Sequence, residues 1–435
     1  MNTVCRDLGV IRISKKQWLM LIGFVISLFS ETALMLWMIA VPILLITFYG
    51  VNGAVEFFIF LQFRSLLSYG VGVTVSGTSA IVKWGAVFCV SFYILIKKKK
   101  IKDNSINCVI LLVCFFSGFA IIAANTTSSY PLVASFKVLS YCVPFVAIIC
   151  GVSETRDRNW IGEIVVFLGI LLVVGLVFIG SEIGYLRNGY SFQGVFNHPN
   201  VYGNMVSLFL AGYLYICKRV NMKSIIGTLL CILLIYPSKS RTAMISVLCV
   251  FAMFMVMQDL SLKNKLLMIL LTVFLLGVII YLNEELVDMI STYVFKGNNP
   301  DVFSSRQIQI TRNLDRFIAH PLCGTGFNVP YVEGEINYSF SFDLMTENGN
   351  LFLALLGDVG IIGFVLFFVA YGKMFLVGKR NLSIIFWVTI LVSMGEMTFF
   401  STNNFGIIMY LYIAIFAIDK REGVIVRNND DEEEY

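Results

Sequence analysis

The sequence predicts an all-α, polytopic integral membrane protein with about 12 transmembrane helices. Hydrophobic residues make up 58% of the 435 residues, and charged residues only 14%, whereas soluble domains carry roughly 25% charge. The mean hydropathy is +0.84. Apolar runs recur near the ~20 residues that a helix needs to cross a bilayer. Because no small-residue cleavage site follows the first run, we expect a retained span rather than a signal peptide.

Clusters of lysine and arginine give the orientation of the spans. The positive-inside rule places all of these clusters in the cytoplasm, and the spans between them then alternate consistently. The clusters are Arg12/Lys15/Lys16, Lys97–Lys100 with Lys102, Arg156/Arg158, Lys218/Arg219/Lys223, Lys263/Lys265 and Lys379/Arg380. The later spans are expected at 106–124, 131–151, 161–180, 201–217, 224–236, 243–257, 266–282, 351–375, 382–399 and 405–418.

The first hundred residues allow two topologies. Residues 18–49 form either one long tilted span or a hairpin around Ser30-Glu31, and residues 55–69 carry the charged Glu56 and Arg64. One long span followed by 80–96 gives 12 spans, whereas a hairpin plus a crossing at 55–69 gives 14 spans. We expect 12, with 55–69 as an interfacial helix on the outer side.

The predicted organisation is a single membrane domain over residues 1–420. It includes one large outer loop at 283–350 and ends in an acidic, solvated cytoplasmic tail at 421–435. The ten cysteines are scattered through apolar runs without a C-x-x-C pair, so we expect neither disulfides nor ligands. Two histidines and the lack of a carboxylate cluster with ligand spacing argue against a metal site.

The turn Asn197-His198-Pro199-Asn200 joins two apolar runs on the predicted outer side. Pro199 favours a helix start at this point. A polar, imidazole-bearing turn at a helix start suits a polar or anionic ligand. A surface turn that caps the next span explains the same residues equally well.

Lys239 and Arg241 break the positive-inside pattern, because they lie in a short polar link on the outer side. They either extend to lipid headgroups or form a fixed cationic site for phosphate, for which the planar guanidinium is well suited.

The large loop contains Arg306 followed by an amphipathic stretch at 307–318. Arg306 stands at the predicted helix start, where a phosphate would gain from both the side chain and the helix dipole. Arg312 and Arg316 share one helix face, which points either to headgroup-level phosphates or to water.

Further polar residues follow in this loop and in the last spans. Gly324-x-Gly326 indicates a sharp turn with close backbone approach, and His320 is either a packing residue or a functional one. Three charged residues in predicted spans are functional candidates because their burial is costly, although pairing with one another explains them equally well. They are Lys137, Asp358 and Glu396.

The order of these motifs resembles the O-antigen ligase/polymerase family, which comprises bacterial integral-membrane glycosyltransferases. The resemblance covers roughly residues 190–365. It implies that the substrate is a glycan on undecaprenyl diphosphate at the outer face of the cytoplasmic membrane. Arg241 and Arg306, with Lys239, would bind the diphosphate. The motifs are Gly194-x-Phe196-x-His198-Pro199-Asn200, Ser240-Arg241-Thr242, Ser305-Arg306, Pro321-Leu322-x-Gly324-x-Gly326 and Gly360-x-x-Gly363.

The ligase branch of this family has a histidine followed by Asn or Ser where the span with the late Gly-x-x-Gly begins. Here the sequence reads Gly349-Asn350, which favours a Wzy-type polymerase of O-antigen, capsule or exopolysaccharide. The alternatives are an O-antigen ligase of the same family or a lipid-linked oligosaccharide flippase or transporter.

The resemblance leaves the general base open among Glu347, His198 and His320, with Glu347 preferred. Asn197, Asn200, Arg312 and Arg316 are the expected substrate-binding residues. Besides the lipid-linked glycan and membrane lipids, a flippase and a chain-length regulator are expected partners. Neither a nucleic acid nor a cofactor is expected, and the transfer is expected to be metal-independent.

Overall fold

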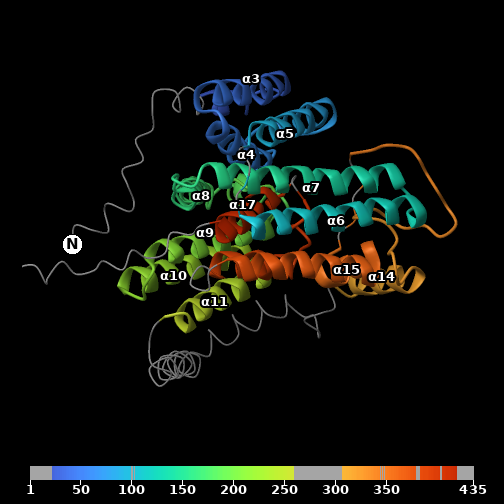
Figure 1. Cartoon of the computed structure of the whole chain (residues 1–435). Coiled ribbons are helices and arrows are strands. Elements are labelled where there is room, and N and C mark those ends of the chain that lie inside the picture. The colour runs from blue at the N-terminus through green and yellow to red at the C-terminus, as the bar shows by residue number, and fades with distance from the viewer. Residues whose placement is uncertain are drawn as a thin grey trace, which may run out of the picture.

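The computed structural model describes residues 22–98, 101, 103–258, 306–342, 344, 346, 348–378, 383–401 and 404–418. These residues form a bundle of helices, most of which run along one common direction (Figure 1). Among the described residues, five helices are long and apolar enough to cross a membrane, which agrees with an all-α polytopic membrane protein. They are α3 (Glu31–Tyr49), α5 (Gly77–Lys97), α6 (Asn104–Thr127), α7 (Pro131–Glu154) and α15 (Leu351–Val377).

Shorter helices complete the described bundle. They are α4 (Val51–Ser65), α8 (Trp160–Leu176), α9 (Pro199–Cys217), α10 (Met222–Ile235), α11 (Arg241–Val256), α14 (Gln307–Ala319), α16 (Ser383–Ser393) and α17 (Gly406–Ile418), with the 3-10 turns η1 (Glu182–Tyr185) and η2 (Tyr236–Ser238). The predicted span at 266–282, the segment 283–305 and the predicted tail at 421–435 lie outside the described residues.

The N-terminal part follows the hairpin alternative, so the expected single long span is wrong. The helical residues 22–26 end in a turn at 27–29, and α3 begins after Ser30. The Ser30 side chain caps α3 by accepting a hydrogen bond from the Ala33 N–H at 3.1 Å. The rings of Phe24 and Trp37 lie 5.7 Å apart, because the chain folds back on itself at this turn.

Helix α4 is a buried element, so its expected position at the outer membrane surface is also wrong. All residues from Gly53 to Arg64 are buried. The two charged residues that suggested an interface have partners inside the protein. Glu56 forms an ion pair with Arg158 at 3.2 Å, and Arg64 donates to the Ser27 hydroxyl at 2.9 Å. With these partners, an apolar helix can carry charge into the core.

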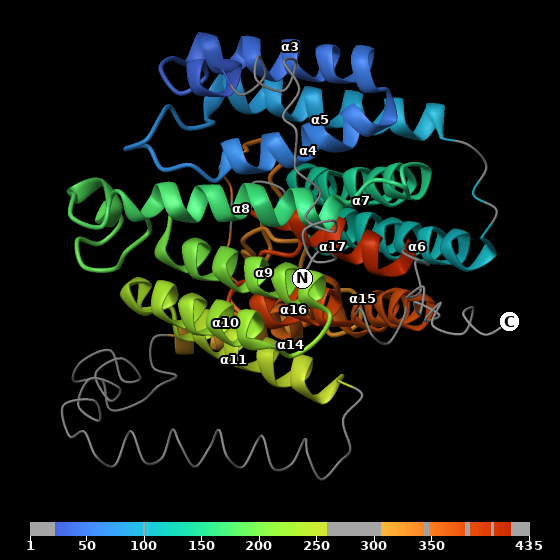
Figure 2. The same ribbon diagram turned by 90° about the vertical axis from the view of Figure 1, so that its left-hand side faces the viewer.

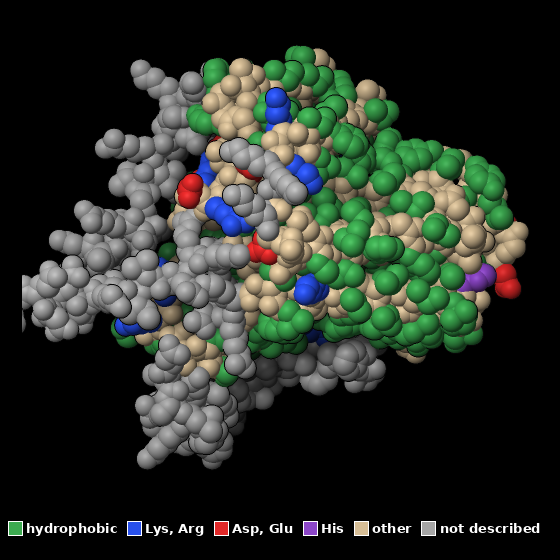
Figure 3. Space-filling view, viewed as in Figure 1, with side chains coloured by type: hydrophobic (Ala, Val, Ile, Leu, Met, Phe, Trp, Pro, Cys, Tyr) green, Lys and Arg blue, Asp and Glu red, His purple; other side chains and the backbone are tan. Residues whose placement is uncertain are grey.

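The remaining helices form layers around the buried α17. Every residue of α17 from Gly406 to Ile418 is buried, and this helix packs on α4, α7, α15 and α16. Helices α8, α9, α10 and α11 lie in sequence beside one another (Figure 2). On the face shown in Figure 3, hydrophobic side chains cover most of the described surface, while the visible lysines and arginines gather toward the left end. This distribution suits a bundle that sits in a bilayer.

Helix α16 is shorter than the predicted span at 382–399. It ends at Ser393, and residues 394–401 form turns and irregular backbone. The apolar composition suggested a continuous helix, but the last hydrogen bonds of this helix are those of the Met394 N–H to the Ile390 and Leu391 carbonyl oxygens. This turn, which we call the 394–401 turn, is the centre of the candidate site.

Candidate active site

Helix α9 begins at the His-Pro-Asn turn, as the sequence predicts. His198 is the N-cap residue, and its ring Nδ1 accepts a hydrogen bond from the Asn200 N–H at 3.1 Å. Pro199 occupies the first helical position, where its missing N–H costs nothing. The Asn200 side chain is therefore held at the helix start, and its Nδ2 donates a hydrogen bond to Glu396 Oε1 in the 394–401 turn.

Helix α11 begins against the same turn. Ser240 is its N-cap residue and Arg241 its first helical residue. Gly395 fits closely on this helix start, because a Cβ atom at position 395 would lie 2.2 Å from Thr242 Cγ2. A larger residue at 395 would force either the Thr242 side chain or the 394–401 turn to move.

Arg306 reaches the turn from the start of α14. Its guanidinium donates a hydrogen bond to the carbonyl oxygen of Gly395. Burial lowers the pKa of the Arg306 guanidinium, while the negative charge of Glu396 raises it and the positive charge of Arg241 lowers it. Arg306, Arg241 and Glu396 therefore lie within electrostatic range of one another, although they are far apart in the sequence.

The start of α15 completes the cluster. Asn350 is the N-cap residue, and its Oδ1 accepts hydrogen bonds from the N–H groups of Phe352 at 2.9 Å and Leu353 at 3.3 Å. Its Nδ2 donates to the Met394 carbonyl oxygen at 3.3 Å. Four helices, α9, α11, α14 and α15, thus begin around the 394–401 turn.

This arrangement can bind an anion. Each helix N-terminus carries roughly half a positive charge from its aligned peptide dipoles, and its first N–H groups have no partners within the helix. Two guanidinium groups add full charges and can hold phosphate oxygens bidentately. Of the three residues expected to bind the diphosphate, the structure brings Arg241 and Arg306 together.

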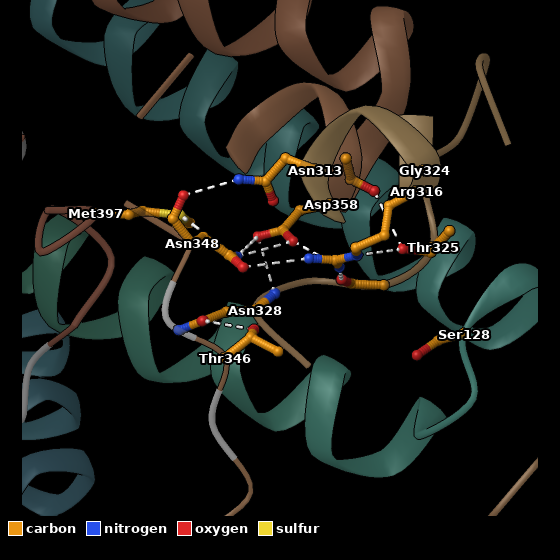
Figure 4. A network of polar contacts seen from close by, with 12 residues as sticks. Ser128, Asn313, Arg316, Gly324, Thr325, Asn328, Thr346, Asn348, Asp358 and Met397 are labelled. Atoms are coloured by element: carbon orange, nitrogen blue, oxygen red, sulfur yellow. Dashed lines mark hydrogen bonds and ion pairs between the residues drawn. The ribbon is translucent and has the colours of Figure 1, made fainter. Parts of the chain in front are cut away.

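A second polar network connects α14 with α15 (Figure 4). Arg316 forms an ion pair with Asp358 at 2.7 Å, and both side chains are almost fully buried. Arg316 also donates to the Thr325 hydroxyl at 2.7 Å and to the Gly326 carbonyl oxygen at 2.7 Å. The expectation that Arg316 faces headgroup phosphates is therefore wrong, because α15 covers this side of α14.

Asn348 joins the two networks. Its Nδ2 lies 3.3 Å from Asp358 Oδ1 and 3.8 Å from Met397 Sδ, the latter in the 394–401 turn. Its backbone oxygen accepts a hydrogen bond from Asn313 at 2.7 Å. The buried ion pair thus helps to fix the chain that leads into α15.

Glycines of the two motifs let the loop at 321–326 pack closely on helix α15. Helix α15 is interrupted at Gly360, which has φ 63° and ψ −171°. The loop at 321–326 supplies partners for the interrupted helix: Ile361 N–H donates to Pro321 O at 2.9 Å, and Thr325 N–H donates to Gly357 O at 2.9 Å. A Cβ at Gly324 would lie 2.3 Å from the Asp358 carbonyl carbon. The predicted close backbone approach at Gly324 is confirmed.

Lys137 on α7 forms hydrogen bonds to the backbone of the outer loop. Its Nζ donates to the backbone oxygens of Asn328 at 2.6 Å and Leu344 at 2.5 Å. A buried ammonium group is costly unless its donors are satisfied, so these bonds give Lys137 a structural role.

The other residues chosen from the sequence lie outside the arginine cluster. Lys239 is exposed and stands over the Tyr190 ring at 4.9 Å. Asn197 and Arg312 are exposed. His320 ends α14 and lies 3.4 Å from the Tyr331 hydroxyl. The length of α14 separates it from Arg306 by about 20 Å. Glu347 lies outside the described residues.

Sequence reasoning gave Glu396 too little weight. Its charge in an apolar run was a signal, but the run also predicted a continuous span, which placed Glu396 inside a helix. Only the end of α16 at Ser393 shows that Glu396 belongs to a turn between four helix starts. Its partner Asn200 is 196 positions away, a pairing that no local pattern reveals.

The comparisons with known proteins bear on this site. A family model described as O-antigen ligase matches residues 226–368. The matched segment includes Arg241, Arg306 and the buried Arg316–Asp358 pair, and the match confirms the resemblance to the O-antigen ligase/polymerase family. The search of the curated proteins gave no match.

Proposed function

From the match of residues 226–368 to the O-antigen ligase family, we propose that this membrane protein is a glycosyltransferase that polymerises undecaprenyl-diphosphate-linked repeat units. The site would face the outer side of the cytoplasmic membrane. The single observation that carries the proposal is the convergence of Arg241 and Arg306 with four helix starts at the 394–401 turn. This cluster offers a diphosphate the fixed charge of the two arginines and the positive ends of the helix dipoles.

The chemistry follows from this charge. A sugar diphosphate is an activated donor, and attack of an acceptor hydroxyl at its anomeric carbon expels undecaprenyl diphosphate. The two arginines would neutralise the charge that develops on the leaving group. The cluster would also hold donor and acceptor in reactive geometry, a contribution that can supply several kcal/mol.

A sequence feature favours polymerase over ligase. The position at which the ligase branch keeps its histidine is occupied by Gly349-Asn350, and Asn350 serves as N-cap of α15. An asparagine amide cannot act as a proton acceptor at neutral pH. The O-antigen ligase reaction remains the second candidate. A flippase or chain-length regulator would act before or with this enzyme.

Arginine substitutions test the binding function. Arg241→Ala and Arg306→Ala should each reduce binding of undecaprenyl diphosphate to the purified protein in nanodiscs and abolish product. Arg219→Ala, which removes an exposed arginine at the predicted cytoplasmic end, is the matched control and should bind normally. Normal binding by both site variants would refute the proposal.

The glycan profile of a deletion strain tests the branch. A polymerase deletion should leave single repeat units on the lipid carrier. Full-length chains that stay on the carrier would instead identify a ligase.

A further inference from the structure

Glu396 is the acidic side chain at the centre of the arginine cluster, and nothing in the diphosphate-binding role explains it. Its negative charge acts on the Arg306 guanidinium, so it competes with a phosphate for that group. A site built only to bind an anion would gain by omitting it. We propose that Glu396 accepts the proton of the attacking acceptor hydroxyl. This inference rests on the proposed function.

The position of Glu396 is fixed from three sides. Asn200 on α9 donates to its carboxylate. Arg306 binds the carbonyl of the preceding Gly395, and Gly395 packs on Thr242 at the start of α11. A proton acceptor needs such a held geometry, because proton transfer requires hydrogen-bond reach to one defined hydroxyl. Glu396 as a whole is partly exposed.

Asn204 is a further polar residue near the start of α9. It lies one turn after Asn200 on the same face of the helix. The residue is 2% exposed, and its Oδ1 has no hydrogen-bond partner among the described residues. Buried acceptors are nearly always satisfied in folded proteins, so we expect a water molecule to supply the missing donor.

The two histidines fit this role less well. The Nδ1 of His198 accepts the Asn200 N–H, so the ring proton belongs on Nε2, which makes that atom a donor and not a base. His320 lies about 20 Å from Arg306 along α14. Neither ring combines a free lone pair with a place at the cluster.

The proposed step balances without a further reactant. The acceptor oxygen forms a bond to the anomeric carbon, and its proton passes to the Glu396 carboxylate. The bond between the anomeric carbon and the phosphate oxygen breaks, and its electron pair leaves with undecaprenyl diphosphate. The proton on Glu396 then returns to water or to the released diphosphate.

The test uses the purified full-length protein in nanodiscs with a lipid-linked repeat unit. Glu396→Gln keeps the size and hydrogen bonding of the side chain but removes its basicity. We expect turnover to fall by about 10²–10⁴-fold, with undecaprenyl diphosphate binding retained. Glu182→Gln, which alters an exposed carboxylate in η1, is the control and should leave turnover unchanged.

Glu347→Gln is the decisive comparison, because Glu347 is the preferred base from the sequence. Near-normal turnover in Glu396→Gln would overturn the proposal, and a large loss in Glu347→Gln alone would assign the base to Glu347. Failure of the proposed function is distinguishable, because it would appear as normal diphosphate binding in Arg241→Ala and Arg306→Ala.

A pH profile separates proton transfer from a merely structural role. The rate of the unaltered protein should fall at acid pH as Glu396 becomes protonated, whereas the residual rate of Glu396→Gln should lack this fall. His198 is a further ionisable side chain beside Asn200 at the cluster. His198→Asn, which preserves an N-cap residue, should keep the acid fall. An acid fall that persists in Glu396→Gln would overturn the proposal.

Discussion

Arg316 on α14 and Asp358 on α15 form a buried ion pair, with 2.7 Å between Nη2 and Oδ1. Each side chain would be an uncompensated buried charge without the other. We therefore expect Arg316→Met or Asp358→Leu alone to destabilise the protein by about 3–5 kcal/mol. The double variant should be closer to the unaltered protein, because no unpaired charge remains.

Thermal unfolding in detergent measures this difference. Arg312→Ala is the matched control on the same helix, because Arg312 is exposed. It should change stability by no more than about 0.5 kcal/mol. If the loss of stability in the double variant equals the sum of the losses in the two single variants, the pair contributes more than the neutralisation of its two charges.

Gly324 packs its backbone on Asp358 and has φ +71°. Gly324→Ala should destabilise the protein by more than about 1 kcal/mol, because the added Cβ has no space and the backbone conformation disfavours it. Gly372→Ala in α15 is the control, because a Cβ there meets nothing within 4 Å. That substitution should raise the unfolding temperature slightly. Equal effects of the two substitutions would contradict the packing described at the Gly360 break.

The sequence predicted the elements of the fold well where a single pattern decides. Apolar length and basic clusters located α5 to α11, and Pro199 marked the start of α9. The prediction that α4 lies at the membrane surface was wrong. A helix with charged residues can lie at a surface or, if those charges have partners, in the core, and the local sequence does not distinguish the two. Arg158 and Ser27, which satisfy Glu56 and Arg64, lie too far away in the chain to be recognised.

Only part of the site could be predicted from the sequence, because the rest also depends on contacts between residues that are distant in the chain. Arg241 stood out because cations are unexpected on the outer side, and Arg306 stood out because it lies at a predicted helix start. Arg316 and Arg312 share a helix face in sequence, but only tertiary packing on α15 buries one of them and leaves the other exposed. The pairing of Asn200 with Glu396 depends on where α16 ends, and hydropathy does not resolve that position.

Chelation of divalent cations tests the charge role of the arginines. If Arg241 and Arg306 neutralise the leaving diphosphate, the purified protein should convert lipid-linked repeat units at an undiminished rate in excess EDTA. Loss of activity that magnesium or manganese restores would show that the arginines alone do not suffice. The measurement is product formation before and after addition of the chelator and of each cation.

Lys239 tests the orientation on which the proposed site depends. It follows η2 directly, has φ 54° and is exposed, so a cysteine at this position should be accessible to water. In a variant without the ten native cysteines, Lys239→Cys should react with an impermeant thiol reagent added to intact cells or spheroplasts. Arg219→Cys, at the predicted cytoplasmic end of α9, should react only after the membrane is permeabilised. The two positions lie at opposite ends of neighbouring helices, which makes them a matched pair. Labelling of Lys239→Cys only after permeabilisation would invert the topology and place the arginine cluster on the cytoplasmic side, where transfer at the outer leaflet could not occur.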